Sequence, residues 1–180
     1  MDFSKLVKMR KTTFEFSEKD VSDAHIVKMI EAARWAPSCT NSQPWHFIVI
    51  KNKKTIDALM DHVNYGFFHG DPRVIVAAIL LQKRCAGSGH ACFRGKDSAM
   101  HDTFASVGIA VEHMALQATE LGIGSCILTP EQSIKKMLGV KKEDVVPLVI
   151  GLGYEKKGAF KRKRERLDLK DLVSYERFKR

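Results

Sequence analysis

Apolar residues recur along the chain with spacings that predict alternating helices and strands. Spacings of three and four predict helices over residues 2–8, 22–36, 55–63 and 99–121. The second helix has a capping residue in Ser22 and must end before Pro37. Continuous or β-branched apolar runs predict strands over residues 46–51, 73–81, 125–128 and 145–151. This alternation predicts a mixed fold of helices and strands.

Two further segments refine this picture. The helix over 99–121 has a broad apolar surface, which predicts burial on more than one side, at the centre of the domain or in a dimer interface. Thr129-Pro130-Glu131-Gln132 has the pattern of a capping box with proline at the first helical position, so it predicts a helix start. No repeat or linker divides residues 1–180, and we expect a single domain.

Composition places the chain among ordinary globular proteins. It has 180 residues, 44% of them hydrophobic and 28% charged, enough for a substantial core. No apolar run approaches the roughly 20 residues of a membrane helix. The start of the chain lacks a signal peptide, so we expect a cytoplasmic protein. The four widely spaced cysteines favour reduced thiols.

The formal net charge of +9 is concentrated in a basic C-terminal segment that begins at about residue 156. From Lys156 onward, eleven Lys and Arg residues face four Asp and Glu residues. Such a segment can be a solvated arm, a nucleic-acid patch or a phosphate clamp. Residues 161–166 contain no aromatic residue, and no nucleic-acid-binding motif occurs elsewhere, which argues against nucleic acid as the main partner.

The loop over residues 36–47 is rich in both prolines and hydrogen-bonding side chains. Pro37 and Pro44 restrict the backbone on either side of Ser38, Thr40, Asn41, Ser42 and Gln43. A rigid loop with many polar groups is typical of a small-molecule site. It is also compatible with a proline-rich helix stop followed by an Asx-type turn.

Several motifs of this chain together resemble one known family. The string Pro-Ser-x-x-Asn-x-Gln-Pro-Trp at residues 37–45 follows Arg10-Lys11-Thr12 by about thirty residues, and residues 120–126, 149–154 and 164–167 continue the match in order. This set resembles the nitroreductase family of FMN-dependent NAD(P)H oxidoreductases. The resemblance implies an α+β fold with a central, mostly antiparallel sheet flanked by helices. It also implies an intertwined homodimer with two FMN sites at the interface.

The resemblance also implies roles for individual residues. The FMN phosphate would be bound by Arg10, Lys11, Thr12, Arg164 and Arg166. The ring and ribityl chain would contact Pro37, Ser38, Cys39 and Asn41 of the partner subunit, and Ile127, Leu128 and the backbone N–H of Thr129. Without the resemblance, Arg10 and Lys11 could belong to an exposed helix end, Arg164 and Arg166 to a solvated tail, and Asn41 could cap its own turn.

One position departs from the family pattern. The family commonly has a second basic residue two positions after the Ser/Thr, and this chain has Phe14 there. The contact with the O2/N1 edge of the ring would then fall to Lys11 or to another residue such as Asn64.

Two other candidate sites have weaker patterns. Cys85, His90 and Cys92 could ligate zinc, but a fourth ligand and a recognisable spacing are missing. Gly87-Ser88-Gly89 lacks the third glycine of a dinucleotide-binding fingerprint. We therefore expect neither a metal nor a Rossmann site.

The implied activity is ping-pong hydride transfer from NAD(P)H through tightly bound FMN to a small organic oxidant, such as a quinone, nitroaromatic, enone or flavin. No side chain is a convincing acid or base. Three alternatives remain open: a reductive dehalogenase or flavin-fragmenting enzyme of the same fold, an FMN storage or sensing module, and a nucleic-acid binder acting through the basic tail. The sequence alone leaves the oxidant and the preferred nicotinamide undecided.

Overall fold

The structure is a computed structural model, and it describes residues 2–63, 70–84 and 96–178. Four strands form one sheet in the order β1-β2-β4-β3, and all neighbouring strands are antiparallel. The strands are β1 (Trp45–Ile50), β2 (Val74–Leu80), β3 (Gly124–Leu128) and β4 (Val145–Gly153). The expected antiparallel sheet is therefore confirmed, with each strand within two residues of its predicted ends.

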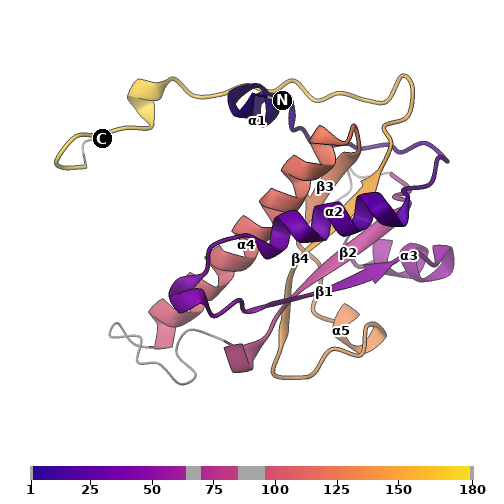
Figure 1. Cartoon of the computed structure of the whole chain (residues 1–180), viewed down its shortest axis with the longest axis horizontal. Helices are drawn as coiled ribbons and strands as arrows, with labels where there is room; N and C mark the ends of the chain where they lie inside the picture. The colour runs from indigo at the N-terminus through magenta and orange to yellow at the C-terminus, as the bar shows by residue number, and fades with distance from the viewer. Residues whose placement is uncertain (1, 64–69, 85–95, 179–180) are drawn as a thin grey trace.

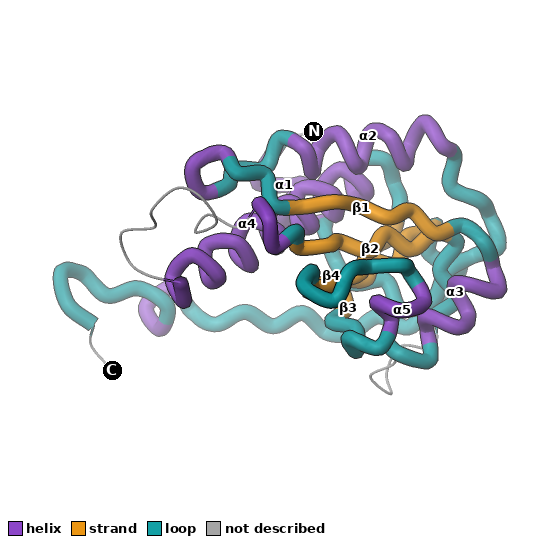
Figure 2. Tube along the Cα trace, turned by 90° about the horizontal axis from the view of Figure 1, so that it is seen from below, coloured by secondary structure: helices purple, strands orange, loops and turns teal. Residues whose placement is uncertain are grey.

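Helices cover both faces of this sheet (Figures 1 and 2). Helices α2 (Asp23–Arg34) and α4 (Lys96–Glu120) pack on one face, and α3 (Lys53–Met60) and the short α5 (Ile134–Met137) pack on the other. The central strand β2 is buried along its whole length because its side chains alternate between these two layers. Val74, Val76, Ala78 and Leu80 point to the α2/α4 layer, and Ile75, Ala77 and Ile79 to the α3/α5 layer.

The predicted helices are present, with shifted ends. Ser22 caps α2 as expected, its hydroxyl accepting a hydrogen bond from His25 N. The third helix begins two residues early, because the side-chain oxygen Oδ1 of Asn52 accepts a hydrogen bond from Thr55 N and caps the helix there. Val107, Val111 and Met114 of α4 are fully buried, whereas Phe104 and Ile109 are each 39% exposed. The broad apolar surface of α4 thus includes side chains that this chain alone does not cover.

The helix start expected at Thr129-Pro130-Glu131-Gln132 is wrong. Helix α5 begins after Ser133 and has only four residues. The Gln132 side chain instead pairs with the backbone of Val146. Its nitrogen Nε2 donates to Val146 O at 2.9 Å, and its oxygen Oε1 accepts from Val146 N at 3.2 Å. This pairing holds the loop against β4 and keeps Gln132 from closing a capping box.

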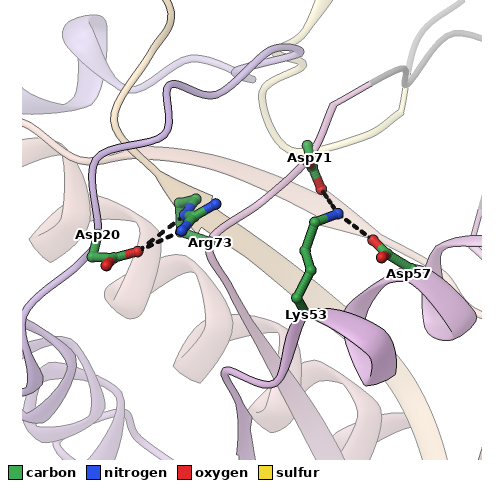
Figure 3. A network of polar contacts seen from close by, with 5 residues as sticks. All are labelled: Asp20, Lys53, Asp57, Asp71 and Arg73. Atoms are coloured by element: carbon green, nitrogen blue, oxygen red, sulfur yellow. Dashed lines mark hydrogen bonds and ion pairs between the residues drawn. The ribbon is translucent and has the colours of Figure 1, made fainter.

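Ion pairs tie the segment before α2 and the start of α3 to the segment that leads into β2 (Figure 3). Arg73 contacts Asp20 at 2.7 Å, and Lys53 contacts both Asp57 and Asp71. The two carboxylates raise the pKa of Lys53 through hydrogen bonds. A cavity of about 380 Å³ lies beside this network, and its cations Lys51, Lys53 and Arg73 all have carboxylate partners among the described residues. None of these three cations is therefore left unpaired for an anionic ligand.

The chain beyond β4 first stays on the body and then leaves it (Figure 1). Lys156 N donates to Glu15 O at 3.1 Å, and Glu155 forms a bridge with Phe16. The tail then passes helix α1 (Phe3–Met9) and includes the 3₁₀ turn η3 (Leu169–Asp171). No helix in the described residues combines the length and the hydropathy needed to cross a bilayer.

Candidate functional site

The segment after α1 lies along the free edge of the sheet. Thr12 forms a parallel bridge with Ser125 of β3, and Thr13 N donates to Ser125 O at 2.9 Å. This close approach requires Gly124, because a Cβ at that position would collide with the Thr13 side chain. The sequence motif includes Gly124, but only the packing reveals that it lets the Arg10-Lys11-Thr12 segment reach the sheet edge.

A cavity of about 730 Å³ opens beside this segment. The lining side chains come from both ends of the chain and from α4: Val7, Arg10, Lys11, Thr12, Phe14, Glu112 and residues 161–166. Arg10, Lys11 and Thr12 thus meet Arg164 and Arg166 around one space. All five residues predicted to bind a phosphate line the same cavity.

The charged groups of the cavity have defined partners. Glu112 accepts two hydrogen bonds from Arg10, at Nε and Nη2, both 3.1 Å. Lys11 Nζ lies 2.6 Å from Glu155, and this ion pair holds the Lys11 side chain in place. Arg164 Nη1 donates to Lys8 O at 2.8 Å and so attaches the tail to the end of α1. The Arg10 Nη1 group takes no part in this fork and has no partner among the residues that the structure describes, so it can donate to a ligand.

Phe14 forms an apolar wall where the family pattern has a basic residue. Its ring lies edge-on to Phe160, with centroids 5.7 Å apart. This contact connects the segment after α1 to the base of the basic tail. The cavity therefore combines a cationic rim with an apolar side.

Two neighbouring residues of β3 add buried polar groups behind the cavity. The hydroxyl of Ser125 is buried and has no hydrogen-bond partner among the described residues. Burial raises the pKa of the Cys126 thiol to about 12, and the positive charge of Arg10 opposes this shift. Cys126 therefore remains a neutral thiol at physiological pH.

The turn that contains Pro37, Ser38, Cys39 and Asn41 lies elsewhere in this chain. None of its residues lines the cavity, and its 3₁₀ turn η1 (Cys39–Asn41) packs near α4. The turn is held by Ser38, whose hydroxyl accepts from Gln43 N at 2.9 Å. Thr40, Asn41 and Gln43 all have positive φ, and such left-handed non-glycine residues are concentrated at functional sites. The sequence did not predict this strain.

Ile127, Leu128 and Thr129 form the end of β3 and the start of the following loop. They do not line the cavity. The loop is fixed to the end of α3: Glu131 N donates to His62 O at 3.0 Å, and the His62 ring nitrogen lies 3.1 Å from both Glu131 and Ser133. The Ser133 hydroxyl also donates to the Glu131 carboxylate at 3.2 Å, and the hydrogen bonds from His62 and Ser133 hold the pKa of Glu131 below its usual range. Thr129 is thus exposed at the head of an anchored loop.

Four of the sequence candidates lie outside the described residues: Asn64, Cys85, His90 and Cys92. Their predicted roles stay predictions. Within the described ranges, no group of three His, Cys, Asp or Glu side chains could hold a metal ion.

Comparison with known proteins gives a consistent result. The model of the Nitroreductase family matches residues 7–154. A relative from Archaeoglobus fulgidus, named as an NADH dehydrogenase/NAD(P)H nitroreductase, is 31% identical over an alignment of 158 residues that covers 84% of each chain.

Solved structures share the fold over almost the whole chain. A nitroreductase family protein from Clostridium difficile has a TM-score of 0.82 at 26% identity and covers 99% of this chain and 100% of its own. A protein from Desulfovibrio desulfuricans, described as a nitroreductase in complex with FMN, has a TM-score of 0.78 at 22% identity and covers 98% of this chain and 97% of its own.

Proposed function

Because the chain belongs to the nitroreductase family of NAD(P)H-dependent oxidoreductases, we propose that the cavity at Arg10 binds the phosphate of FMN. The observation that carries this proposal is the convergence of Arg10, Lys11 and Thr12 with Arg164 and Arg166 around one cavity. A phosphate monoester carries nearly two negative charges at neutral pH, so it requires several fixed cations.

The residues present fit this group. Arg10 is preorganised by Glu112 and retains its Nη1 donor, and guanidinium groups bind phosphate oxygens through paired hydrogen bonds. Thr12 adds a hydroxyl donor. Arg164 and Arg166 donate to backbone carbonyls in this chain, so neither is neutralised by a carboxylate within the described residues. These groups orient a dianion without themselves reacting.

When bound, FMN supplies hydride chemistry, taking a hydride from NAD(P)H and passing it to a small organic oxidant such as a quinone, nitroaromatic, enone or flavin, in ping-pong order. The protein contributes binding, orientation and electrostatic stabilisation. Thr129 is an exposed residue at the head of an anchored loop, and its backbone N–H would be directed at the ring edge. No side chain is required as an acid or base.

The position of the 37–41 turn supports the proposal of a homodimer. Since Pro37, Ser38, Cys39 and Asn41 are remote from the cavity of their own chain, we propose that they reach the cofactor of the partner subunit. Exposed apolar side chains on the faces that would pair support this arrangement, among them Trp35 at 72% exposure and Phe104 of α4.

Replacement of Arg10 tests the site. Arg10→Ala removes one guanidinium and leaves the Glu112 carboxylate facing the phosphate, so we expect FMN binding to weaken by about 1–3 kcal/mol. FMN retention after dialysis, read from the flavin absorption, measures this loss. Arg73→Ala is the control, because Arg73 is paired with Asp20 and does not line the cavity at Arg10.

Undiminished flavin in the Arg10→Ala protein would contradict the phosphate role. Mixing the wild-type yellow protein with NADH or NADPH in a stopped-flow instrument then separates an enzyme from a flavin store. Bleaching of the flavin absorption is expected for the enzyme, and retention of the oxidised spectrum would instead support a storage or sensing module.

A further inference from the structure

The cavity holds more positive charge than one phosphate requires. Seven cationic side chains and two carboxylates line it. Glu112 is paired with Arg10, and Glu165 is paired with Lys163 at 2.8 Å. Lys161, Arg162, Arg164 and Arg166 have no carboxylate partner in the part of the chain that the structure describes.

The segment that carries these charges is fixed at both ends. Before Lys161, Phe160 packs edge-on against Phe14, and its backbone N–H donates to Glu15. After Arg162, the Arg164 side chain is attached to Lys8 O at the end of α1. Lys161 and Arg162 therefore lie in a short span between two anchored points, and they are not part of the free end of the tail.

All six residues 161–166 line the cavity, so the cations of this short span share one space. Lys163 is paired with Glu165, and Arg164 and Arg166 are assigned to the FMN phosphate. The neighbouring residues Lys161 and Arg162 are then left for a second anion at the same cavity.

We propose that Lys161 and Arg162 bind the 2′-phosphate of NADPH, so that this enzyme prefers NADPH to NADH. The proposal rests on the proposed FMN site. NADPH differs from NADH only by a phosphate monoester on the adenosine ribose, and a pair of cations without carboxylate partners is what such a group requires. Lys161 and Arg162, held at the rim of the cavity, distinguish NADPH from NADH without altering the flavin chemistry.

The test compares the wild type with the double variant Lys161→Gln/Arg162→Gln, both loaded with FMN, at low ionic strength. In the wild type, kcat/KM for NADPH is expected to exceed that for NADH by about tenfold or more, the ratio expected for a charge-assisted contact. The double variant should lose most of this ratio. Lys170→Gln is the matched control, because Lys170 is paired with Asp168 and lies outside the cavity.

A binding measurement gives a readout independent of turnover. Calorimetric titration with adenosine 2′,5′-bisphosphate should show binding to the wild type and loss of binding in the double variant, and adenosine 5′-monophosphate should bind much more weakly. A short DNA duplex is a further ligand in this titration. Binding of the duplex as tightly as the bisphosphate would overturn the proposal in favour of a general polyanion surface.

The proposal would also be overturned by a wild type that does not prefer NADPH, or by an equal loss of kcat/KM for NADPH and NADH in the double variant. Loss of FMN from the double variant would overturn it as well, because it would assign Lys161 and Arg162 to the flavin phosphate. If the wild type takes up no FMN, the proposed function itself fails. The bisphosphate titration of the flavin-free protein then still decides whether the second phosphate site exists.

Discussion

Cys126 occupies an unusual position for an ionisable residue, in the sheet directly behind the cationic cavity. Its side chain packs with Phe16 and Leu128 and is only 3% exposed. Burial disfavours the thiolate and raises the pKa of Cys126 to about 12, although the Arg10 guanidinium lowers it. The packing against apolar neighbours therefore outweighs the attraction of a nearby positive charge.

This raised pKa predicts a specific loss of stability in alkaline solution. In the unfolded chain the thiol titrates near its ordinary value of about 8.5, whereas in the folded chain it keeps its proton up to about 12. Above the ordinary value the unfolded state is stabilised by deprotonation, so the free energy of unfolding should fall by up to about 1.4 kcal/mol per pH unit. Cys126→Ala removes this contribution.

Urea unfolding of both proteins with a reductant present, at several values between pH 8 and 11, measures the effect. The difference between the wild type and Cys126→Ala should shrink steadily as the pH rises. The baseline cost of the cavity left by the substitution does not affect this slope. Two stability curves that run parallel across the range would show that the Cys126 thiol is not protected from ionisation.

Helix α1 illustrates how an element without a buried side chain is held in place. None of its residues is buried. The helix lies against α4, and at its C-terminal end the Arg10 fork on Glu112 of α4 fixes it to the body. The Arg164 hydrogen bond to Lys8 O joins the same end to the tail. Because partly exposed ion pairs contribute little free energy, we expect α1 to open locally well before the protein unfolds.

Glu112→Ala tests this attachment. The substitution removes the acceptor of both Arg10 hydrogen bonds, so amide hydrogen exchange over residues 3–9 should accelerate severalfold. The global free energy of unfolding should change by only about 1 kcal/mol or less, as for other partly exposed ion pairs. Asp102→Ala is the control on the same helix, because Asp102 is exposed. Unchanged exchange in α1 would mean that other contacts hold it.

The elements that could be predicted from the sequence are those whose signal is local. The fully apolar run of β2 and the Ser22 cap of α2 need no tertiary information, and both predictions hold. The expected helix at residues 129–132 failed because Gln132 pairs with the backbone of Val146, a partner distant in sequence. Local capping signals do not reveal such competition.

The candidate site shows the same limit. The family motifs indicated which residues would converge, and the cavity brings the predicted phosphate ligands together. The Glu112 partner of Arg10 and the close approach at Gly124 depend on packing between distant segments, so no spacing in the sequence indicated them. The positive φ values of Thr40 and Gln43 could not be predicted from the sequence either, because neither residue type favours that conformation.

At the scale of the whole molecule, the C-terminal tail extends away from the body with its apolar side chains uncovered (Figure 1). The most exposed of these are Leu167, Leu169, Leu172, Tyr175 and Phe178, each more than 60% exposed. Such an apolar segment on an isolated chain is costly in water. The proposed dimer would cover this segment and would also bring the 37–41 turn of one subunit to the cavity of the other.

Truncation after Arg166 tests this arrangement because it separates the two roles of the tail. The shortened chain keeps Arg10, Arg164 and Arg166 and so all proposed phosphate ligands, but it loses the apolar segment. We expect the full chain to sediment as a dimer and the shortened chain to dissociate at micromolar concentration. FMN should be lost together with the dimer, because the partner's turn no longer reaches the ring.

The full-length variant Leu169→Ser/Leu172→Ser provides a milder version of the same test, since it changes two exposed side chains and no proposed cofactor ligand. It should weaken dimerisation and FMN retention together, and raising the protein concentration should restore both. A shortened chain that sediments as a monomer and still retains FMN as tightly as the full chain would show that one subunit holds the cofactor alone. The 37–41 turn would then need another explanation for its strained backbone.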